Sequence, residues 1–314
     1  MTTLPSSKPT MPPLRYHVQH VTEYDYDHTV TLSQQLLHLT PRDSVYQQCL
    51  YHQIRISPAP SESAEHADFF GNQSRCFSIY APHEALRVSA EFSVQLTARP
   101  TMESLPASTP WTVLRDMLQE QASQHLEACA YLYGSPKVPC SPALADYASL
   151  AFTPDRPILD ASLALTQQIY RDFEYDADAT DVSTPLHEVL HNKRGVCQDF
   201  AHLMAGCLRS LGLACRYVSG YILTNRDAGQ PALIGADASH AWVSVYCPQY
   251  GWVDFDPTNN CLVQHEHVTM AWGRDYTDVS PMRGVVLGGG GQRLKVSVTV
   301  TAIDAGAPTV QLPL

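Results

Sequence analysis

Strict alternation of apolar and polar residues in the stretch LRVSAEFSVQLT, residues 86–97, most constrains how this chain can fold. Side chains on a β-strand point to opposite faces in turn, so the apolar half of this stretch would cover one face of a sheet. The stretches YHVQHVTEYDY and LYHQIRI, residues 16–26 and 50–56, alternate similarly, and turn-forming residues lie between the alternating stretches. The first hundred residues therefore predict an antiparallel β-sandwich.

A helical pattern follows this β region. Apolar residues between 110 and 150 have helical spacing, further helices are expected near 160–173 and 185–194, and three strands and a closing alternating stretch come later. The predicted fold class is α+β. The predicted parts are a disordered N-terminus at 1–14, the β-sandwich domain at 15–102, a helical connector at 103–155, an α+β core at 156–275 and closing strands at 276–314.

Charge and cysteine usage exclude several classes of function. The net charge is −11 and no Lys/Arg cluster is present, which argues against a nucleic-acid partner. No apolar run reaches the roughly 18 to 20 residues of a membrane helix, and the N-terminus does not resemble a signal peptide, so a cytoplasmic protein is expected. The nine cysteines are odd in number and scattered, and no CxxC occurs, so neither a disulfide framework nor a structural zinc cluster is expected.

The stretch RGVCQDFAHLM, residues 194–204, places Cys197 at a predicted helix start. Gly195 is expected to end the preceding helix in the left-handed conformation, and Gly212 to end the new one. A thiol in a first helical turn lies where free N–H groups and the helix dipole favour the thiolate. The predicted buried stripe of this helix comprises Phe200, Leu203, Met204, Cys207, Leu208 and Leu211.

A nucleophilic thiol needs a base and a group that orients the base. His240 opens a predicted strand, Asp256 ends the next, and the turn CPQYG lies between them. A hairpin centred near Pro248 would place His240 and Asp256 directly opposite one another on one face. Asp254 shares that face and Asp237 is close in sequence, so both remain alternatives for the carboxylate.

The stretches GVCQDFAHLMAGCLRSLGLACRYVSGY and ASHAWVSVYCPQYGWVDFDPTN resemble the core of the bacterial transglutaminase-like cysteine protease superfamily. The stretches HVTEYDY, LHLTPRD and DFFGN are similar to the β-sandwich that precedes this core in a bacterial subfamily, and GRDYTDVSPMRGV is similar to its closing segment. The resemblance implies a papain-like or transglutaminase-like α+β core. It also implies that Cys197 is the nucleophile, His240 the general base and then acid, and Asp256 the orienting carboxylate.

Residues around these three have weaker assignments. The backbone N–H of Cys197 is expected to hold the oxyanion, with a second donor unassigned. Gln198 and Asp199 flank the nucleophile, and for Asp199 a capping role is preferred. Trp242 and Trp252 either shield the site or serve as core aromatics.

Three patterns that suggest metals are interpreted as incidental. HEVLH, residues 187–191, fits H-E-x-x-H, but Glu266 is the only glutamate beyond residue 188 that could complete a zinc site. DADATDV, residues 176–182, lacks the glycine and final glutamate of an EF-hand. HEH, residues 265–267, has two alternate histidines, which are more often incidental than ligands. No metal and no cofactor are expected.

The expected function is cleavage of a peptide or amide bond through a cysteine acyl-enzyme, with a peptide or protein as substrate. Hydrolysis is favoured because soluble bacterial members of the resembling superfamily are mostly taken to be proteases. Amine transfer by a transglutaminase uses the same three residues and remains the alternative. A non-catalytic scaffold that only grips peptide is the second alternative.

Overall fold

The computed structural model describes residues 13–105, 108–223 and 239–303. The predicted disordered N-terminus lies almost wholly outside these ranges, and so does Asp237. Within these ranges the chain forms a seven-stranded sheet, a five-stranded sheet and a set of helices, so the α+β fold class is confirmed. No helix in the same ranges is both long and apolar enough to span a membrane.

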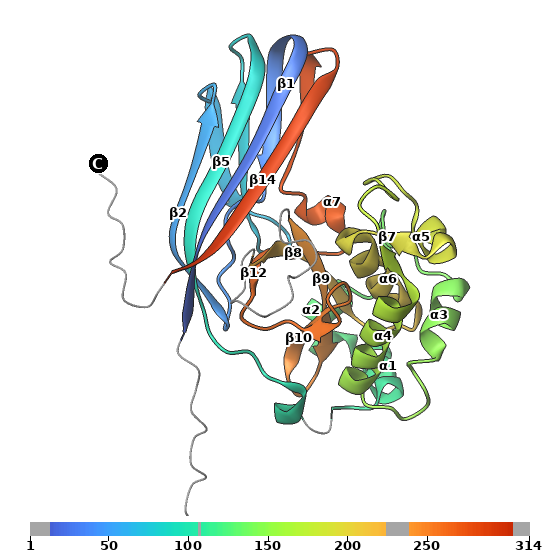
Figure 1. Cartoon of the computed structure of the whole chain (residues 1–314). Helices are drawn as coiled ribbons and strands as arrows, with labels where there is room; N and C mark the ends of the chain where they lie inside the picture. Colours follow the sequence, from blue (N-terminus) through green and yellow to red (C-terminus); the bar gives the residue numbers. More distant parts are fainter. Residues whose placement is uncertain (1–12, 106–107, 224–238, 304–314) are drawn as a thin grey trace, which may run out of the picture.

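The first sheet is antiparallel and curled around one long strand, β1 (Figure 1). The first half of β1 pairs with β5 and β14, and the second half pairs with β4 and β13. The remaining strands β2 and β3 extend the sheet beyond β5 and β4. The bounds are Leu14–Leu37 (β1), Gln47–Ser57 (β2), Glu62–Ala67 (β3), Gln73–Ile79 (β4), His83–Leu96 (β5), Met282–Gly288 (β13) and Gln292–Ile303 (β14).

The alternating stretch that predicted the first sheet is β5. Its apolar residues from Leu86 to Leu96 are all buried, while the polar residues between them are exposed or half-buried. Each polar residue faces away from the core because successive side chains of a strand alternate. The β-sandwich expectation therefore takes the form of a single curled sheet. One part of its apolar face packs on itself, and the other part packs on Tyr221, Val268 and Met270 from later in the chain.

The second sheet is antiparallel with strand order β11-β10-β9-β8-β12, and it lies between the first sheet and the helices (Figure 1). Its strands are Cys215–Ile222 (β8), His240–Cys247 (β9), Gly251–Asp256 (β10), Cys261–Leu262 (β11) and His267–Gly273 (β12), and Glu174–Tyr175 (β6) pairs with Arg194–Gly195 (β7) separately. The α-helices are Trp111–Glu120 (α1), Leu126–Cys129 (α2), Pro142–Ser149 (α3), Ile158–Asp172 (α4), Leu186–Asn192 (α5), Cys197–Ser210 (α6) and Tyr276–Val279 (α7).

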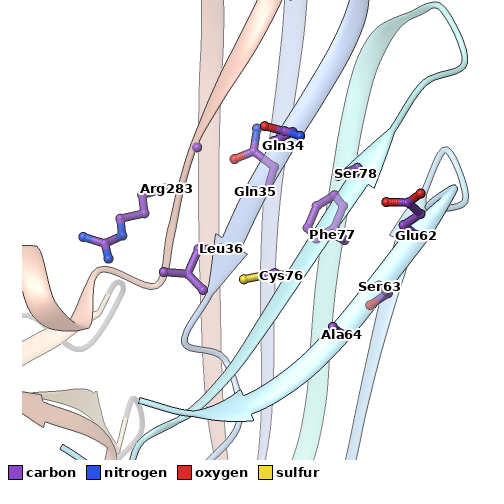
Figure 2. A pocket seen from close by; sticks show the side chains of 11 residues that line it. Gln34, Gln35, Leu36, Glu62, Ser63, Ala64, Cys76, Phe77, Ser78 and Arg283 are labelled. Carbon is purple, nitrogen blue, oxygen red and sulfur yellow. The ribbon is translucent and has the colours of Figure 1, made fainter. Parts of the chain in front are cut away.

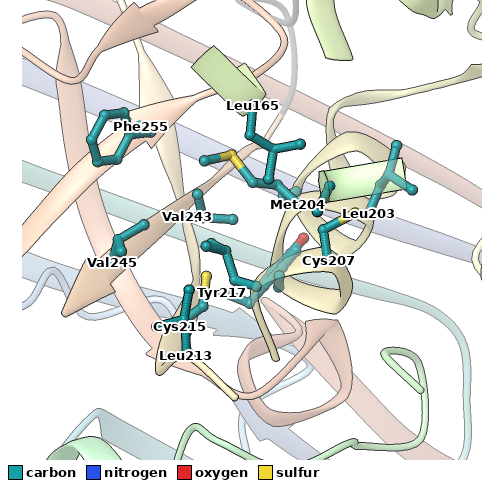
Figure 3. Packing of buried hydrophobic residues seen from close by; sticks show 14 of the residues in the cluster. Leu165, Leu203, Met204, Cys207, Leu213, Cys215, Tyr217, Val243, Val245 and Phe255 are labelled. Atoms are coloured by element: carbon teal, nitrogen blue, oxygen red, sulfur yellow. The ribbon is translucent and has the colours of Figure 1, made fainter. Parts of the chain in front are cut away.

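Helix α6 is the central element of the main core. Apolar residues along α6 pack with residues of β8, β9 and β10 in one buried cluster (Figure 3). The predicted stripe is buried except for Leu211, which is half-buried, and Gly212 follows the helix with φ +77° as expected. Helices α1 and α3 contribute Leu114 and Leu144 to the same cluster. This cluster holds the first turn of α6 against the strands that carry His240 and Asp256.

The first sheet holds β12 in place through a buried amide. The side chain of Gln47 donates to the backbone oxygen of Thr269 at 2.7 Å and accepts from the backbone nitrogen of Thr269 at 2.8 Å. Both residues are buried, with exposed fractions of 2% and 3%. A buried backbone group must be hydrogen-bonded, so this pair of hydrogen bonds fixes where β12 lies. The first sheet thus positions a strand of the second.

Candidate functional site

The structure places the three predicted site residues at the ends of adjacent elements. Cys197 is the first residue of α6, His240 the first of β9 and Asp256 the last of β10. The sulfur of Cys197 lies 3.9 Å from the backbone oxygen of Ser239, which directly precedes His240. The side chains of His240 and Asp256 are fully buried, whereas Cys197 keeps an exposed fraction of 8%. The sulfur is therefore next to the strand start that carries the imidazole.

His240 and Asp256 are joined by a hydrogen bond of 2.8 Å from Nε2 to Oδ2. The predicted register was wrong by two residues: Gly251 pairs with Cys247, and Phe255 with Val243. The turn is longer than expected because three residues separate the paired ends and Gly251 has φ +73°. Asp256 therefore lies diagonal to His240, and both still share one face because the shift is even.

Asp254, the alternative carboxylate, bonds other partners. Its Oδ2 accepts from Nη1 of Arg99 at 2.6 Å and from Nε1 of Trp242 at 3.3 Å. The ion pair with Arg99 links the second sheet to the segment after β5. Of the two aspartates at the end of β10, it is Asp256 that bonds the imidazole of His240.

Asp256 accepts five hydrogen bonds from described residues. Oδ1 accepts from the backbone nitrogens of Thr258 at 2.9 Å and Asn259 at 3.1 Å. Oδ2 accepts from Nε2 of His240 at 2.8 Å, Nε2 of His267 at 3.0 Å and Nδ2 of Asn259 at 2.8 Å. A buried carboxylate is stable only when its oxygens are satisfied in this way. The two backbone bonds fix which oxygen faces the imidazoles.

Charge in this buried cluster is governed by the carboxylate. Burial opposes the charged form of His240, but the charge of Asp256 and then that of Cys197 outweigh it and raise the pKa of His240 from 6.5 to about 10. Burial likewise opposes the charge on Asp256, yet the charge of His240 and the bonds from both histidines hold its pKa well below 3.8. Burial lowers the pKa of His267, which is therefore the neutral imidazole of the pair.

The bond to Asp256 sets the tautomer of His240. An ionised carboxylate only accepts, so Nε2 of His240 carries a proton. Its other nitrogen, Nδ1, is buried and has no hydrogen bond of ordinary geometry within the described ranges. Because the charge of Cys197 reaches this ring, Nδ1 is the atom available to exchange a proton with the sulfur.

The head of α6 is held by Asp199. Its Oδ2 accepts from the backbone nitrogen of Val196 at 2.9 Å and from Oγ1 of Thr180 at 2.6 Å, so the preferred capping role is confirmed. The N–H groups of a first helical turn have no partner within the helix. Cys197 and Gln198 belong to this first turn, at the end of α6 that carries the sulfur.

The expectation for Gly195 was wrong. Helix α5 ends at Asn192, and the left-handed residue is Lys193 with φ 57°. Gly195 is required for a different reason, because a Cβ there would lie 2.6 Å from Oδ2 of Asp199. The glycine lets the Asp199 carboxylate approach the backbone and cap α6.

We expect Gly195→Ala to lower the free energy of unfolding by about 1 to 3 kcal/mol, since overpacking costs this much in a tight site. Displacement of the Asp199 carboxylate should also slow alkylation of Cys197. Thermal unfolding and mass-spectrometric alkylation rates measure the two effects. Gly251→Ala is the control: its added Cβ has open space around it, so strain at φ +73° can lower stability without changing the alkylation rate. Equal alkylation rates in the Gly195 variant and the wild type would contradict the expectation.

Two residues of the site were missed from the sequence. His267 was interpreted as incidental within HEH, yet it is 1% exposed and bonded to Asp256. Asn259, which follows Asp256 in the stretch DPTN, donates to the same carboxylate. The proximity of Asn259 to Asp256 in the chain was a usable signal. The position of His267 depends on how β12 joins the sheet, which no local pattern reveals.

The tryptophans of the hairpin have different surroundings. Trp242 is fully buried, and its ring meets that of His267 edge-on at 5.2 Å. Trp252 stacks instead on Arg216, whose Cζ lies 3.7 Å from its ring centre. Trp242 therefore packs beside the histidines, whereas Trp252 belongs to another cluster.

The described residues contain one group of side chains that could together bind a metal ion: His240, Asp256 and His267. Their possible ligand atoms lie within 4.8 Å of one another. Both histidines are already hydrogen-bonded to Asp256, so a metal would displace those bonds. The histidines of HEVLH are exposed on α5 and lie outside this group. In DADATDV, the side chain of Asp181 accepts from the backbone and side chain of Ser183.

A hollow of about 610 Å³ lies elsewhere, on the first sheet (Figure 2). Residues of β1, β3, β4 and β13 line it, including Gln34, Glu62, Phe77 and Arg283. None of its lining residues belongs to the cluster around Cys197. It is thus separate from the candidate active site.

Two family descriptions match the chain. Residues 147–257 match the family described as "Transglutaminase-like superfamily". Residues 16–95 match the family described as "Bacterial transglutaminase-like N-terminal region". The first match contains Cys197, His240 and Asp256, and the second covers most of the first sheet.

Relatives match over most of the chain. An uncharacterised protein of Mycobacterium tuberculosis is 40% identical over 278 residues, which is 87% of each chain. An uncharacterised protein of Mycobacterium leprae is 31% identical over 293 residues, covering 92% of this chain and 99% of that one. A protein-glutamine gamma-glutamyltransferase of Pseudomonas aeruginosa is 37% identical over only 67 residues, 21% of this chain and 10% of the other.

One solved structure has the same fold throughout. It comes from Cytophaga hutchinsonii and is described as a "Putative Cysteine Protease". Its TM-score is 0.74 at 19% identity, and the match covers 94% of this chain and 92% of that one. With both family matches in the expected chain order, this protein belongs to the transglutaminase-like superfamily and carries the bacterial N-terminal region.

Proposed function

We propose that the protein is a cysteine-dependent acyl-transfer enzyme that hydrolyses peptide or amide bonds. Cys197 is the nucleophile, His240 the general base and acid, and Asp256 the orienting carboxylate. The 2.8 Å bond from His240 to Asp256 carries this proposal, because it leaves Nδ1 as the basic atom beside Cys197. The fold shared with the Cytophaga hutchinsonii protein supports the same class of activity.

The reaction follows from these positions. The sulfur of Cys197 attacks the substrate carbonyl carbon, and the oxyanion is stabilised by N–H groups of the first turn of α6. The imidazolium of His240 gives the proton on Nδ1 to the leaving nitrogen, so an amine departs and a thioester remains. Nδ1 then takes a proton from water, the hydroxyl attacks the thioester, and the carboxylic acid leaves as the thiolate–imidazolium pair is restored.

A transglutaminase is the second candidate. It would form the same thioester from a glutamine side chain with loss of ammonia, and a lysine amine would then take the place of water. The 67-residue similarity to a protein-glutamine gamma-glutamyltransferase favours this possibility. A glutamine dipeptide supplied with a fluorescent primary amine separates the two: hydrolysis turns the glutamine into a glutamate residue of the dipeptide and releases ammonia, and transfer yields the fluorescent amide with release of ammonia.

Selective alkylation tests the proposed nucleophile against a scaffold. We expect iodoacetamide at pH 7 to label Cys197 at least about tenfold faster than any other cysteine, because a thiolate paired with an imidazolium reacts where a thiol does not. Mass spectrometry of tryptic peptides over time gives each rate. Cys76 and Cys140 are exposed and provide the internal comparison. Labelling of Cys197 no faster than these two would refute an activated thiol and favour the scaffold.

A further inference from the structure

His267 shares the carboxylate that orients the proposed base. Its Nε2 lies 3.0 Å from Oδ2 of Asp256, the same oxygen that His240 bonds at 2.8 Å. The rings of the two histidines are 6.0 Å apart. Because the carboxylate only accepts and burial keeps His267 neutral, its proton lies on Nε2, and its buried Nδ1 has no hydrogen bond among the described residues.

The surroundings of His267 fix this ring from two sides. Its strand, β12, is held by the two hydrogen bonds between the side chain of Gln47 in the first sheet and the backbone of Thr269. Its ring also packs against the Trp242 ring in a T-shaped arrangement, with the ring centres 5.2 Å apart. That tryptophan lies over Gly220, where a Cβ would come within 2.5 Å of its ring. The imidazole of His267 therefore lies on a strand held at Thr269 and packs against a buried tryptophan.

We infer that His267 is a positioning residue, which holds the Asp256 carboxylate and limits how strongly it stabilises the imidazolium of His240. This inference rests on the proposed function of Cys197, His240 and Asp256. The N–H of His267 uses one lone-pair direction of Oδ2 and places the positive end of a dipole beside the carboxylate. Without that dipole the carboxylate attracts the charge on His240 more strongly and has one fewer bond to fix its plane.

Several titratable and charged groups among the described residues act on His240 and His267, and they must be considered before a pH profile is interpreted. Asp256 from β10 and Cys197 from α6 act on His240. Asp256, His240 and Arg99 act on His267. Tyr175 and Tyr217 are affected by the charge of Cys197, and burial raises the pKa of each phenol, so both stay neutral near pH 7. A change in the pH profile on replacing His267 thus reports on the shared carboxylate.

The test compares two replacements of His267 in the full chain. His267→Gln keeps an N–H close to the position of Nε2, and His267→Phe removes it while keeping the ring bulk. The readout is the ratio of the alkylation rates of Cys197 by iodoacetate and iodoacetamide as pH rises, since the anionic reagent is favoured only while the imidazolium is present. His20→Phe is the matched control, because His20 is also a 1% exposed histidine but bonds Thr22 and Tyr221.

We expect the pH at which this ratio falls to half to rise by about half a unit or more in His267→Phe, and turnover to fall by up to about 100-fold. His267→Gln should restore both toward the wild type, and His20→Phe should lower only the melting temperature. If the phenylalanine variant does not fold, His267→Asn takes its place, since its amide is too short to reach Oδ2.

Four results are decisive. A His267→Phe or His267→Asn profile that superimposes on the wild type overturns the inference, and so does a shift that His267→Gln fails to reverse. Slow alkylation of Cys197 in the wild-type protein overturns the proposed function instead. A shifted profile with rescue by glutamine supports His267 as the residue that positions Asp256.

Discussion

Cys197→Ser is expected to reduce kcat/KM by at least about 10⁴-fold while the protein stays folded. The hydroxyl of serine has a pKa far above that of a thiol, so the neighbouring imidazole cannot hold it ionised, and no thioester can form. Serine is close to cysteine in size, and the sulfur of Cys197 lies a long 3.9 Å from the backbone oxygen of Ser239, so the free energy of unfolding should change by less than about 1 kcal/mol. Amide hydrolysis and thermal unfolding give the two quantities.

Cys207→Ala is the matched control for this variant. Cys207 lies in the same helix, is fully buried, and burial raises the pKa of its thiol well above that of a free cysteine. Its removal should cost about 1 kcal/mol of stability through a small cavity and leave turnover nearly unchanged. A Cys197→Ser protein that retains more than a tenth of wild-type turnover would contradict the assignment of the nucleophile.

Asp256→Asn is the second change expected to have a large effect, a loss of about 10³- to 10⁴-fold in kcat. The backbone N–H groups of Thr258 and Asn259 both donate to Oδ1, so they would hold the amide oxygen of the new residue at that position. Its NH₂ group would then face Nε2 of His240 and Nε2 of His267. His240 would have to accept at Nε2 and carry its proton on Nδ1, which removes the base beside Cys197.

The tautomer change can be observed directly. Nitrogen NMR of histidine-labelled protein should show His240 protonated on Nδ1 in Asp256→Asn and on Nε2 in the wild type at a pH where the ring is neutral. Asp254→Asn, two residues earlier on the same face, is the control. It weakens the buried bond to Arg99 and should lower stability without changing the tautomer of His240. An Asp256→Asn enzyme with wild-type kcat would remove Asp256 from the mechanism.

Features determined by neighbours in the chain were predictable from the sequence. The helix of Cys197 follows from its apolar stripe, its end follows from Gly212, and the cap follows from Asp199 three residues after Val196. The shared face of His240 and Asp256 follows from parity, which survived an error of two residues in the register. Such features depend on periods that hold over one helix or one hairpin.

Features that depend on packing between distant segments were not predictable in this way. Gly195 was assigned to a helix end, whereas the approach of Asp199 is what requires it. His267 contacts Asp256 because β12 pairs with β8 on the far side of β9 and because Gln47 of the first sheet holds β12. The strand order of a sheet is a long-range property, so a pattern confined to residues 265–267 carries no information about it.

Pairing of β1 with β13 and β14, which lie far along the chain, has a consequence for how the protein is made. Val18 of β1 faces Val300 of β14, and Leu37 faces Met282 of β13. During synthesis β1 can pair early with β5 and β4, but its other hydrogen-bonding edge stays open until β13 and β14 have emerged. An open strand edge can pair with other nascent chains, so protection of β1 by a chaperone, rather than formation of α6, is expected to limit the yield of folded protein.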